Sequence, residues 1–133
     1  MPSDRDQPTE QPVIRTVAMP ADTNPAGDIF GGWLMSQMDL AAGTLAASTS
    51  KGRSATVAVD AMKFLRPVKV GDEVSLYASI EAMGRTSMRI HVEAWRRERH
   101  DAISEQVTEA SFTFVALDSS GRPRPIGENS QTD

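Results

Sequence analysis

The sequence contains no cysteine, which excludes disulfide bridges, thiolate metal ligands and a cysteine nucleophile. Its two histidines, His91 and His100, are too isolated to form a metal-ligand motif or a Ser/His/Asp group, so we expect no metal site. No run approaches the roughly 18 apolar residues that a membrane span needs, and the first residues lack the apolar core of a secretory signal. We therefore expect a cytoplasmic protein that does not enter the membrane and whose chemistry comes from carboxylates, amides, hydroxyls and the backbone.

An excess of basic residues is also missing. The chain has 14 Lys and Arg against 18 Asp and Glu, which gives a net charge of −4 and a pI near 5.1. Because nucleic-acid binding requires a broad basic field, nucleic acid is excluded as the main partner, although a local basic cluster could still bind a small anionic ligand. The length of 133 residues, with 39% hydrophobic and 24% charged residues, is typical of one globular domain.

Charge is scarcest between Gly31 and Ser50, where Asp39 is the only ionisable side chain. This stretch is rich in helix-forming and small residues, and it follows a loop of turn-forming residues. We predict a helix that begins at about Gly31, extends to about Ala47 and is ended by the Lys-Gly pair at 51–52, whose glycine is the candidate left-handed residue. An exposed helix of this length would carry several charges on its outer face. We therefore expect a helix surrounded by protein on every side, with one carboxylate inside it.

Segments with the patterns of β-strands flank this helix. A short apolar segment precedes it, and a segment rich in Val, Thr and Ala follows it. Two further segments alternate apolar and polar residues and are joined by a tight connection, which is the pattern of adjacent antiparallel strands. The predicted strands are Val13–Met19, Ser54–Phe64, Glu73–Glu81, Ser87–Ala94 and about Ile103–Leu117.

The order of these elements predicts an α+β fold. One early helix followed by four consecutive strands allows an antiparallel sheet to curl around the helix. We place this single domain at residues 13–118. The polar, proline-bearing leader at 1–12 and the tail at 119–133, which contains Pro, Ser and Asn, are expected to be disordered.

Three motifs carry a family resemblance. The motif N-x-x-G-x-x-x-G-G, followed by Met-Asp on the predicted helix (NPAGDIFGGWLMSQMD), is far more specific than a glycine pair alone. Together with MKFLRPVKVGDEV and GRTS it resembles the acyl-CoA thioesterases of the hotdog fold, in particular the short bacterial YciA-like enzymes and the related cytosolic acyl-CoA hydrolases. The resemblance extends from about Arg15 to Leu117.

The resemblance implies a single hotdog domain, in which an antiparallel sheet wraps around one long central helix. It implies an enzyme that hydrolyses acyl-CoA to a free carboxylic acid and coenzyme A without a metal or cofactor. It further implies a homodimer joined edge to edge, with active sites at the subunit interface, and often a homohexamer built as a trimer of dimers.

Asp39 has two readings. At helical offsets of three and four it shares a small and polar stripe with Ser36 and Gly43, which could be an exposed face that bears a solvated acid. If the helix is buried, the carboxylate is partly removed from water and can act as a general base on water or as a nucleophile. A thioester suits such a catalyst, because its leaving thiol has a pKa of about 8.5 and departs with little acid assistance.

Gly31 and Gly32 begin the helix, where backbone N–H groups are unpaired and a ligand carbonyl can approach closely. They indicate either tight helix–sheet packing or an oxyanion hole with the Gly32 N–H as main donor, and the resemblance favours the oxyanion hole. Asn24, before a proline, is by itself a typical turn residue, and Asp28 is typical of an N-cap or turn acid and a weaker site candidate. By resemblance, Asn24 and Asp39 cooperate from opposite subunits.

The phosphates of coenzyme A require cations and N–H donors near the mouth of the pocket. Arg66 and the turn that starts at Gly84 are the main candidates, with Lys63 and Lys69 as further ones, and the alternative for each is an ordinary solvated charge. The predicted substrate-binding residues are therefore Gly31, Lys63, Arg66, Gly84, Arg85, Thr86 and Ser87. The acyl channel could be lined by Trp33, Met35 and Met38, although such residues on a buried helix are more typical of core.

Two other functions stay open beside the acyl-CoA thioesterase. A non-catalytic acyl-CoA sensor on the same fold usually carries a DNA-binding module, and the polar leader at 1–12 is too short for one. A hotdog dehydratase would need a histidine on or near the central helix, whereas the first histidine is His91.

Overall fold

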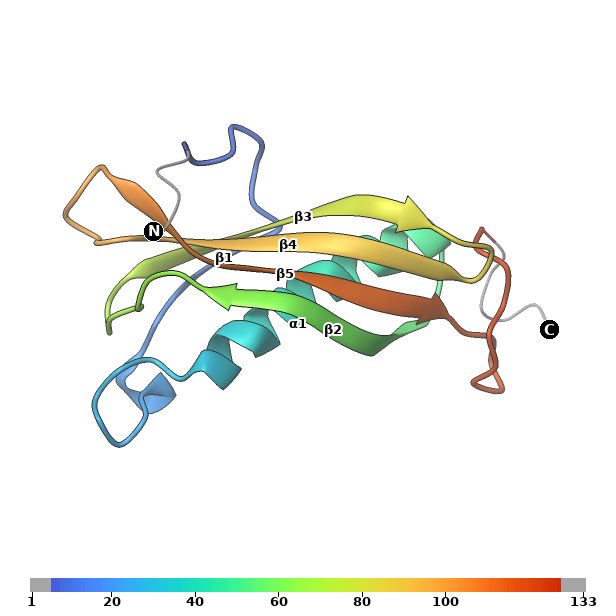
Figure 1. Ribbon diagram of the computed structural model, residues 1–133, viewed down its shortest axis with the longest axis horizontal. Coiled ribbons are helices and arrows are strands. Elements are labelled where there is room, and N and C mark those ends of the chain that lie inside the picture. The colour runs from blue at the N-terminus through green and yellow to red at the C-terminus, as the bar shows by residue number, and fades with distance from the viewer. Residues whose placement is uncertain (1–5, 128–133) are drawn as a thin grey trace.

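The computed structural model describes residues 6–127. In this part of the chain one long helix, α1, is accompanied by five strands and a short 3-10 helix, η1 (Figure 1). Every predicted strand and the predicted helix are present. Their bounds are β1 Ile14–Val17, η1 Pro20–Asp22, α1 Gly31–Ser50, β2 Ser54–Phe64, β3 Glu73–Met83, β4 Ser87–Arg97 and β5 Ser104–Ala116.

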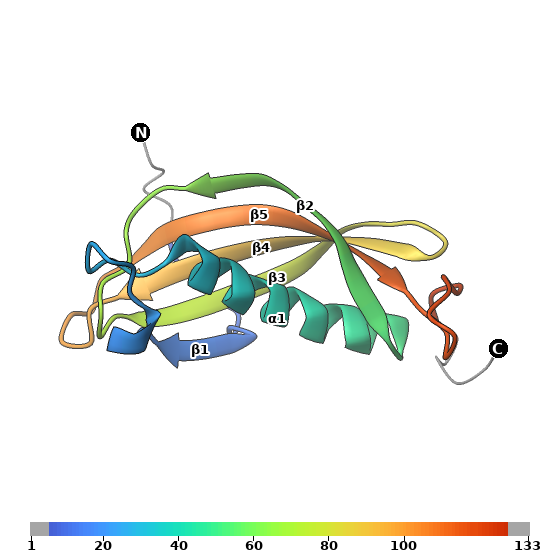
Figure 2. The same cartoon turned by 90° about the horizontal axis from the view of Figure 1, so that it is seen from below.

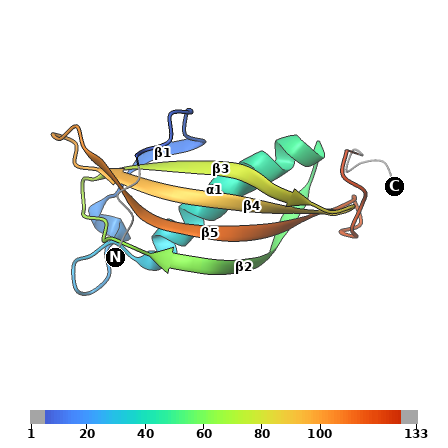
Figure 3. The same cartoon turned by 45° about the horizontal axis from the view of Figure 1, so that its top comes forward.

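The strands form one antiparallel sheet in the order β1-β3-β4-β5-β2, so β1 and β2 are its edges. Figure 3 shows β3, β4, β5 and β2 side by side, with α1 behind them. In Figure 2 the sheet is curved, and α1 lies along its hollow face. The predicted α+β fold, an antiparallel sheet around one long helix, is confirmed.

The core lies between α1 and the inner face of the sheet. Alternate residues of the central strands point toward the helix, as the period of two requires. Helix α1 can lie close to them because many of its buried positions are alanines. The buried core includes Leu34, Met38, Ala41, Ala42 and Ala46 of α1, and Leu76, Ile90, Val92, Phe112 and Phe114 of the sheet.

Helix α1 keeps one face free in the single chain, so the prediction that protein surrounds it on every side does not hold there. Leu40 is 58% exposed and Met35 39%, and Val57 on the neighbouring strand β2 is also 58% exposed. The five strands curl over one side of the helix only. The missing charges of α1 therefore leave apolar side chains exposed on α1, at its start and on the neighbouring edge strand β2. We refer to this set as the α1–β2 face: Phe30, Met35, Leu40, Val57, Val59 and Phe64.

The C-terminal end of α1 lies further along the chain than predicted, at Ser50. The left-handed residue is Lys51, with φ of 59°, and not the predicted glycine. Arg124 is 2% exposed and donates through Nη1 to the Ser50 carbonyl at 2.9 Å and through Nε to the Leu117 carbonyl at 2.8 Å. Arg124 thus connects the segment after β5 to the helix end. The disorder predicted for residues 119–133 stays a prediction.

The N-terminal segment also makes ordered contacts. Gln7 donates through Nε2 to the Tyr77 hydroxyl at 2.8 Å, on the face of the sheet that points away from α1. The disorder predicted for the leader at 1–12 likewise stays a prediction. Parts of both predicted flanks, 1–5 and 128–133, lie outside the described residues. Within the described part of the chain, no helix is both long enough and apolar enough to cross a membrane.

Candidate active site

Asp39 lies in the first half of α1, at the border of the α1–β2 face, and is half-buried. Its Oδ1 accepts a hydrogen bond of 2.5 Å from the Thr56 hydroxyl on β2. Thr56 carries no signal in the sequence, because a threonine in a strand is ordinary and its 17-residue separation from Asp39 follows no helical or strand period. The lone acid of the helix is thus neither inside a closed core nor on a fully solvated face.

Gly31 and Gly32 form the first turn of α1, and Phe30 is the N-cap residue. A Cβ atom placed on Gly31 would lie 3.4 Å from the Phe64 ring, so Gly31 serves close packing between the helix and β2. Gly32 is exposed, and a Cβ atom placed there would meet nothing within 4 Å. Because the first N–H groups of a helix have no acceptor within it, Gly32 offers an accessible backbone donor.

Asn24 organises the loop before α1. Its Oδ1 accepts hydrogen bonds from the backbone N–H groups of Ala26 at 3.0 Å and Asp28 at 3.1 Å, and its own N–H donates to the Asp28 carbonyl at 2.7 Å. This is the turn role expected of an asparagine before a proline. Since the carbonyl oxygen of the side chain is used in the loop, the Nδ2 donors are the part of Asn24 suited to a ligand.

Asp28 forms an ion pair with Lys69, with a distance of 3.3 Å between Oδ1 and Nζ, and both side chains are largely exposed. This pair connects the loop before α1 to the connection between β2 and β3. Asp28 is therefore a loop acid that neutralises a lysine, and it is not the N-cap that its position suggested.

A cavity of about 300 Å³ lies beside the start of α1. It brings together Gly31 and Arg66, two of the predicted substrate-binding residues. Arg66 is held at its wall, because Nη1 donates to the Gln106 carbonyl at 2.9 Å and Nε lies 3.3 Å from a carboxylate oxygen of Glu105. The cavity is lined by Ile29, Gly31, Leu34, Phe64, Leu65, Arg66, Pro67 and Val68.

The predicted acyl-channel residues of α1 separate into two groups. Met38 is fully buried in the core, and Trp33 packs against that core. Met35 is exposed on the α1–β2 face. Met38 thus has the core role that the sequence favoured for all three.

The turn between β3 and β4 lies at the other end of the molecule. Gly84 donates its N–H to the Ser87 carbonyl at 2.9 Å, and the Arg85 carbonyl accepts from the N–H of Ile126. Because the segment 124–126 also contacts the end of α1, this turn lies near the C-terminal end of the helix (Figure 1). A 20-residue helix is about 30 Å long. One chain therefore does not bring Gly84, Arg85, Thr86 and Ser87 close to the glycine pair.

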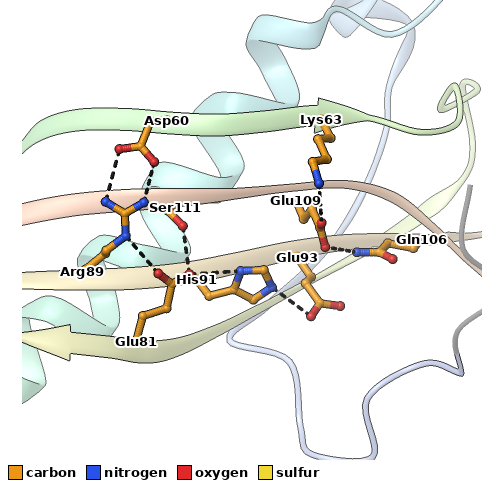
Figure 4. Close-up of polar contacts among 9 residues, drawn as sticks. All are labelled: Asp60, Lys63, Glu81, Arg89, His91, Glu93, Gln106, Glu109 and Ser111. Atoms are coloured by element: carbon orange, nitrogen blue, oxygen red, sulfur yellow. Dashed lines mark hydrogen bonds and ion pairs between the residues drawn. The ribbon is translucent and has the colours of Figure 1, made fainter.

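Lys63 belongs to a polar cluster on the outer face of the sheet, away from Asp39. Figure 4 shows this cluster across β2, β5, β4 and β3, with α1 behind the strands. The Lys63 Nζ lies 3.9 Å from Glu109, and its side chain is 65% exposed. The cluster consists of Asp60, Lys63, Glu81, Arg89, His91, Glu93, Gln106, Glu109 and Ser111.

His91 is the centre of this outer cluster. Its Nε2 lies 3.1 Å from Glu93 and its Nδ1 3.3 Å from Glu81. The hydrogen bond with Glu93 raises the pKa of His91 above its usual value, although partial burial opposes the shift. Partial burial also acts on Glu81, but hydrogen bonds from Ser111 and Arg89 outweigh it and lower the pKa of that carboxyl.

The same cluster contains the group of possible metal ligands found in the described residues. One ligand atom each from His91, Glu93 and Glu109 lies within 4.8 Å of the others. Glu93 also accepts from Trp95 Nε1 at 2.9 Å, and Glu109 from Gln106 Nε2 at 3.0 Å. These carboxylates take part in hydrogen bonds and ion pairs on the face of the sheet opposite Asp39, so this group is not part of the candidate active site.

Comparisons with known proteins identify the family of the chain. The family model of the Thioesterase superfamily matches residues 26–103. The acyl-CoA thioester hydrolase YciA of Escherichia coli strain K12 is 50% identical over 117 residues, which cover 86% of this chain and 89% of the relative.

Two solved structures show the same fold. The hexameric thioesterase y2039 from Yersinia pestis superimposes with a TM-score of 0.85 at 46% identity. The match covers 92% of this chain and 100% of that chain. The hexameric hotdog fold thioesterase Cj0915 of Campylobacter jejuni has a TM-score of 0.83 at 39% identity, with coverage of 89% of this chain and 91% of that chain. The resemblance seen in the sequence motifs is confirmed: the chain belongs to the thioesterase superfamily and has its hotdog fold.

Proposed function

We propose that this protein hydrolyses acyl-CoA thioesters to a free carboxylic acid and coenzyme A. The observation that carries the proposal is the lone carboxylate of α1, Asp39, held at an accessible border of the helix in a chain of the thioesterase superfamily. Relatives about 50% identical over most of the chain are named acyl-CoA thioester hydrolases, which supports the choice of substrate.

In this mechanism Asp39 acts as general base or as nucleophile. As a base it takes a proton from water while the water oxygen attacks the thioester carbonyl. The C–S bond then breaks, and the sulfur takes that proton from Asp39, so that coenzyme A leaves as its thiol and the carboxylate is restored. The Nδ2 group of Asn24 orients the water or the carbonyl, and the Gly32 N–H stabilises the oxyanion that forms. All these groups belong to the polypeptide, so we propose that the reaction uses no metal and no organic cofactor.

The proposed active unit is a homodimer. Gly32 and Asp39 are seven residues apart on a helix that rises about 1.5 Å per residue, so about 10 Å separates them along the axis. One reacting carbonyl must lie about 3 Å from both an oxyanion donor and the catalytic group. A second chain, with its helix antiparallel to the first, resolves this conflict by placing its Gly32 near Asp39 of the first chain.

The surface of the chain supports the same dimer. The α1–β2 face is apolar, and β2 is an edge strand with most of its residues exposed. An uncovered edge strand with apolar side chains is a template for pairing with another chain. We propose that β2 pairs with β2 of a second copy, and that three such dimers assemble into a hexamer, as the hexameric description of two solved relatives suggests.

We also propose a nucleotide clamp for the substrate. Arg66, at the wall of the cavity beside Gly31, is its main member, and the Gly84–Ser87 turn of the second chain is the other. Lys63 is a further candidate only if the nucleotide reaches the outer face of the sheet. The cytoplasmic location predicted from the sequence stays a prediction.

The test is a panel of acyl-CoA substrates of different chain lengths, with release of free thiol as the readout. We expect turnover by the wild type and a loss of at least about 100-fold in kcat for Asp39→Asn, which keeps the shape of the side chain but removes the base. The matched control is Asp60→Asn on the outer face of the sheet, which should keep wild-type activity. If the wild type binds acyl-CoA but does not hydrolyse it, the enzyme hypothesis is wrong and the non-catalytic sensor is supported.

A further inference from the structure

We propose that Glu105 is a positioning residue for Arg66, which it holds in the orientation that binds the phosphates of coenzyme A. This inference rests on the proposed thioesterase function and its nucleotide clamp. Arg66 lines the cavity beside the start of α1, and its side chain is only 19% exposed. A guanidinium binds a phosphate through a planar fork of N–H groups, so its orientation decides whether the two fit.

Glu105 lies at the start of β5 and joins Arg66 to a second arginine. Its Oε2 lies 3.3 Å from Nε of Arg66, and its Oε1 accepts a hydrogen bond of 2.8 Å from Nη2 of Arg96. Arg96 lies directly opposite Glu105 in the pairing of β4 with β5. The carboxylate is therefore held from the side of β4, and its place determines where the Nε edge of Arg66 lies.

Asp72 anchors the far end of this group of charges. Its carboxylate is almost fully buried, and its Oδ2 accepts from Nη1 of Arg96 at 3.2 Å and from the backbone N–H of Lys69 at 2.9 Å. Asp72 and Lys69 belong to the connection between β2 and β3, and so does Arg66. The four charged side chains thus form a closed path that leaves this connection, passes through β5 and β4, and returns to it.

Two contacts from the start of β5 define the plane of the Arg66 guanidinium. Nη1 donates to the backbone carbonyl of Gln106 at 2.9 Å, and Nε faces the side chain of Glu105. The first contact belongs to the backbone and remains after any substitution at position 105. Without the carboxylate the guanidinium loses its partner on the Nε side and can turn about the Gln106 contact.

The group supplies orientation and not charge. Two arginines and two acids cancel, so the path as a whole adds no net charge that would attract a phosphate. Partly buried ion pairs also contribute little net stability, because the cost of desolvation offsets the attraction between the charges. A role in orienting Arg66 therefore predicts a loss of nucleotide binding when Glu105 is removed, whereas a role through charge alone predicts tighter binding.

The test compares acyl-CoA with an acyl-pantetheine, which lacks the nucleotide. We expect Glu105→Ala to raise KM for acyl-CoA about fivefold, which is less than the effect of removing Arg66 itself. Glu105→Gln should raise it by no more than about threefold, because the remaining oxygen can still accept from one arginine. In both variants, kcat and KM for the acyl-pantetheine should change by less than about twofold.

A double variant identifies the route of the effect. If Glu105 acts through Arg66, then Arg66→Ala/Glu105→Ala should have the KM of Arg66→Ala within about twofold. The matched control is Glu73→Ala, which removes the acid of a similar ion pair, 3.1 Å from Arg97, and should keep the wild-type KM. Thermal unfolding and size-exclusion chromatography establish that each variant is folded and assembled.

The proposal is overturned if Glu105→Ala lowers KM for acyl-CoA, leaves it unchanged or raises KM equally for both substrates. It is also overturned if the effects of the two single variants multiply in the double variant. A wild type without thioesterase activity would overturn the proposed function itself. An active wild type that loses nucleotide binding in Arg66→Ala but not in Glu105→Ala would overturn only the role of Glu105.

Discussion

Arg124 provides the sharpest test of how the chain after β5 supports the central helix. Its guanidinium is almost completely buried and donates to the carbonyls of Ser50, Leu117 and Arg53, at 2.9, 2.8 and 3.1 Å. The Ser50 carbonyl belongs to the last turn of α1, where carbonyls find no N–H donor within the helix and the helix dipole favours a cation. We expect Arg124→Met, which keeps much of the apolar packing, to destabilise the protein.

The magnitude follows from the carbonyls that lose their donor. A buried polar group left without a partner costs about 1–3 kcal/mol. The Arg53 carbonyl keeps a second donor, the N–H of Leu117 at 2.9 Å, so Ser50 and Leu117 supply most of the loss. The substitution also removes the cost of burying the guanidinium, which offsets part of this loss. We therefore expect the free energy of unfolding to fall by about 2–4 kcal/mol.

The assay is urea unfolding followed by circular dichroism and tryptophan fluorescence at one fixed protein concentration, because the stability of an oligomer depends on concentration. Arg122→Met is the matched control, since Arg122 is exposed in the same segment and should change stability by less than about 0.5 kcal/mol. If Arg124→Met also loses less than about 0.5 kcal/mol, the contacts of this segment do not hold the helix end in solution.

Three further predictions concern pH, substrate binding and assembly. Because folding raises the pKa of His91, the protonated imidazole stabilises the protein fully below about pH 6.5, its pKa in the unfolded chain. This stabilisation is lost as the pH rises through the pKa of the folded state. His91→Gln should therefore flatten the fall in Tm above about pH 6.5. Arg66→Ala should raise KM for acyl-CoA about 10-fold but leave KM for an acyl-pantetheine, which lacks the nucleotide, nearly unchanged, with the exposed Arg122→Ala as control. Leu40→Glu, on the α1–β2 face, should yield a monomer with at least about 10-fold lower activity, whereas Ile103→Glu, which is 68% exposed elsewhere, should not.

Each of these predictions has a distinct contrary result. The outer cluster would have no role in pH dependence if His91→Gln and the control His100→Gln gave the same Tm profile. Equal effects of Arg66→Ala on both substrates would assign Arg66 to the wall of the cavity and not to the nucleotide. A Leu40→Glu variant that remains a fully active oligomer would remove the α1–β2 face from the dimer interface.

The elements themselves were determined by the sequence alone, because their signals are local. The alternation of apolar and polar residues specified the central strands, and the stretch from Gly31 to Ser50, with only one ionisable side chain, specified one long helix. The same stretch singled out Asp39, and the motif around Asn24 and the glycine pair indicated the family that the comparisons confirm. Period and composition act over a few residues, so no tertiary information was needed.

Only the tertiary structure decided which residues meet. Thr56 of β2 donates to Asp39 of α1 across a separation of 17 residues, and no local pattern predicts that contact. Arg124 is charged and near the end of the chain, so composition assigned it to a disordered tail, but three carbonyls in the fold compensate its burial. The free face of α1 is likewise a property of how far five strands can curl around one helix. Distances between residues remote in sequence depend on packing, and packing is what the sequence pattern leaves open.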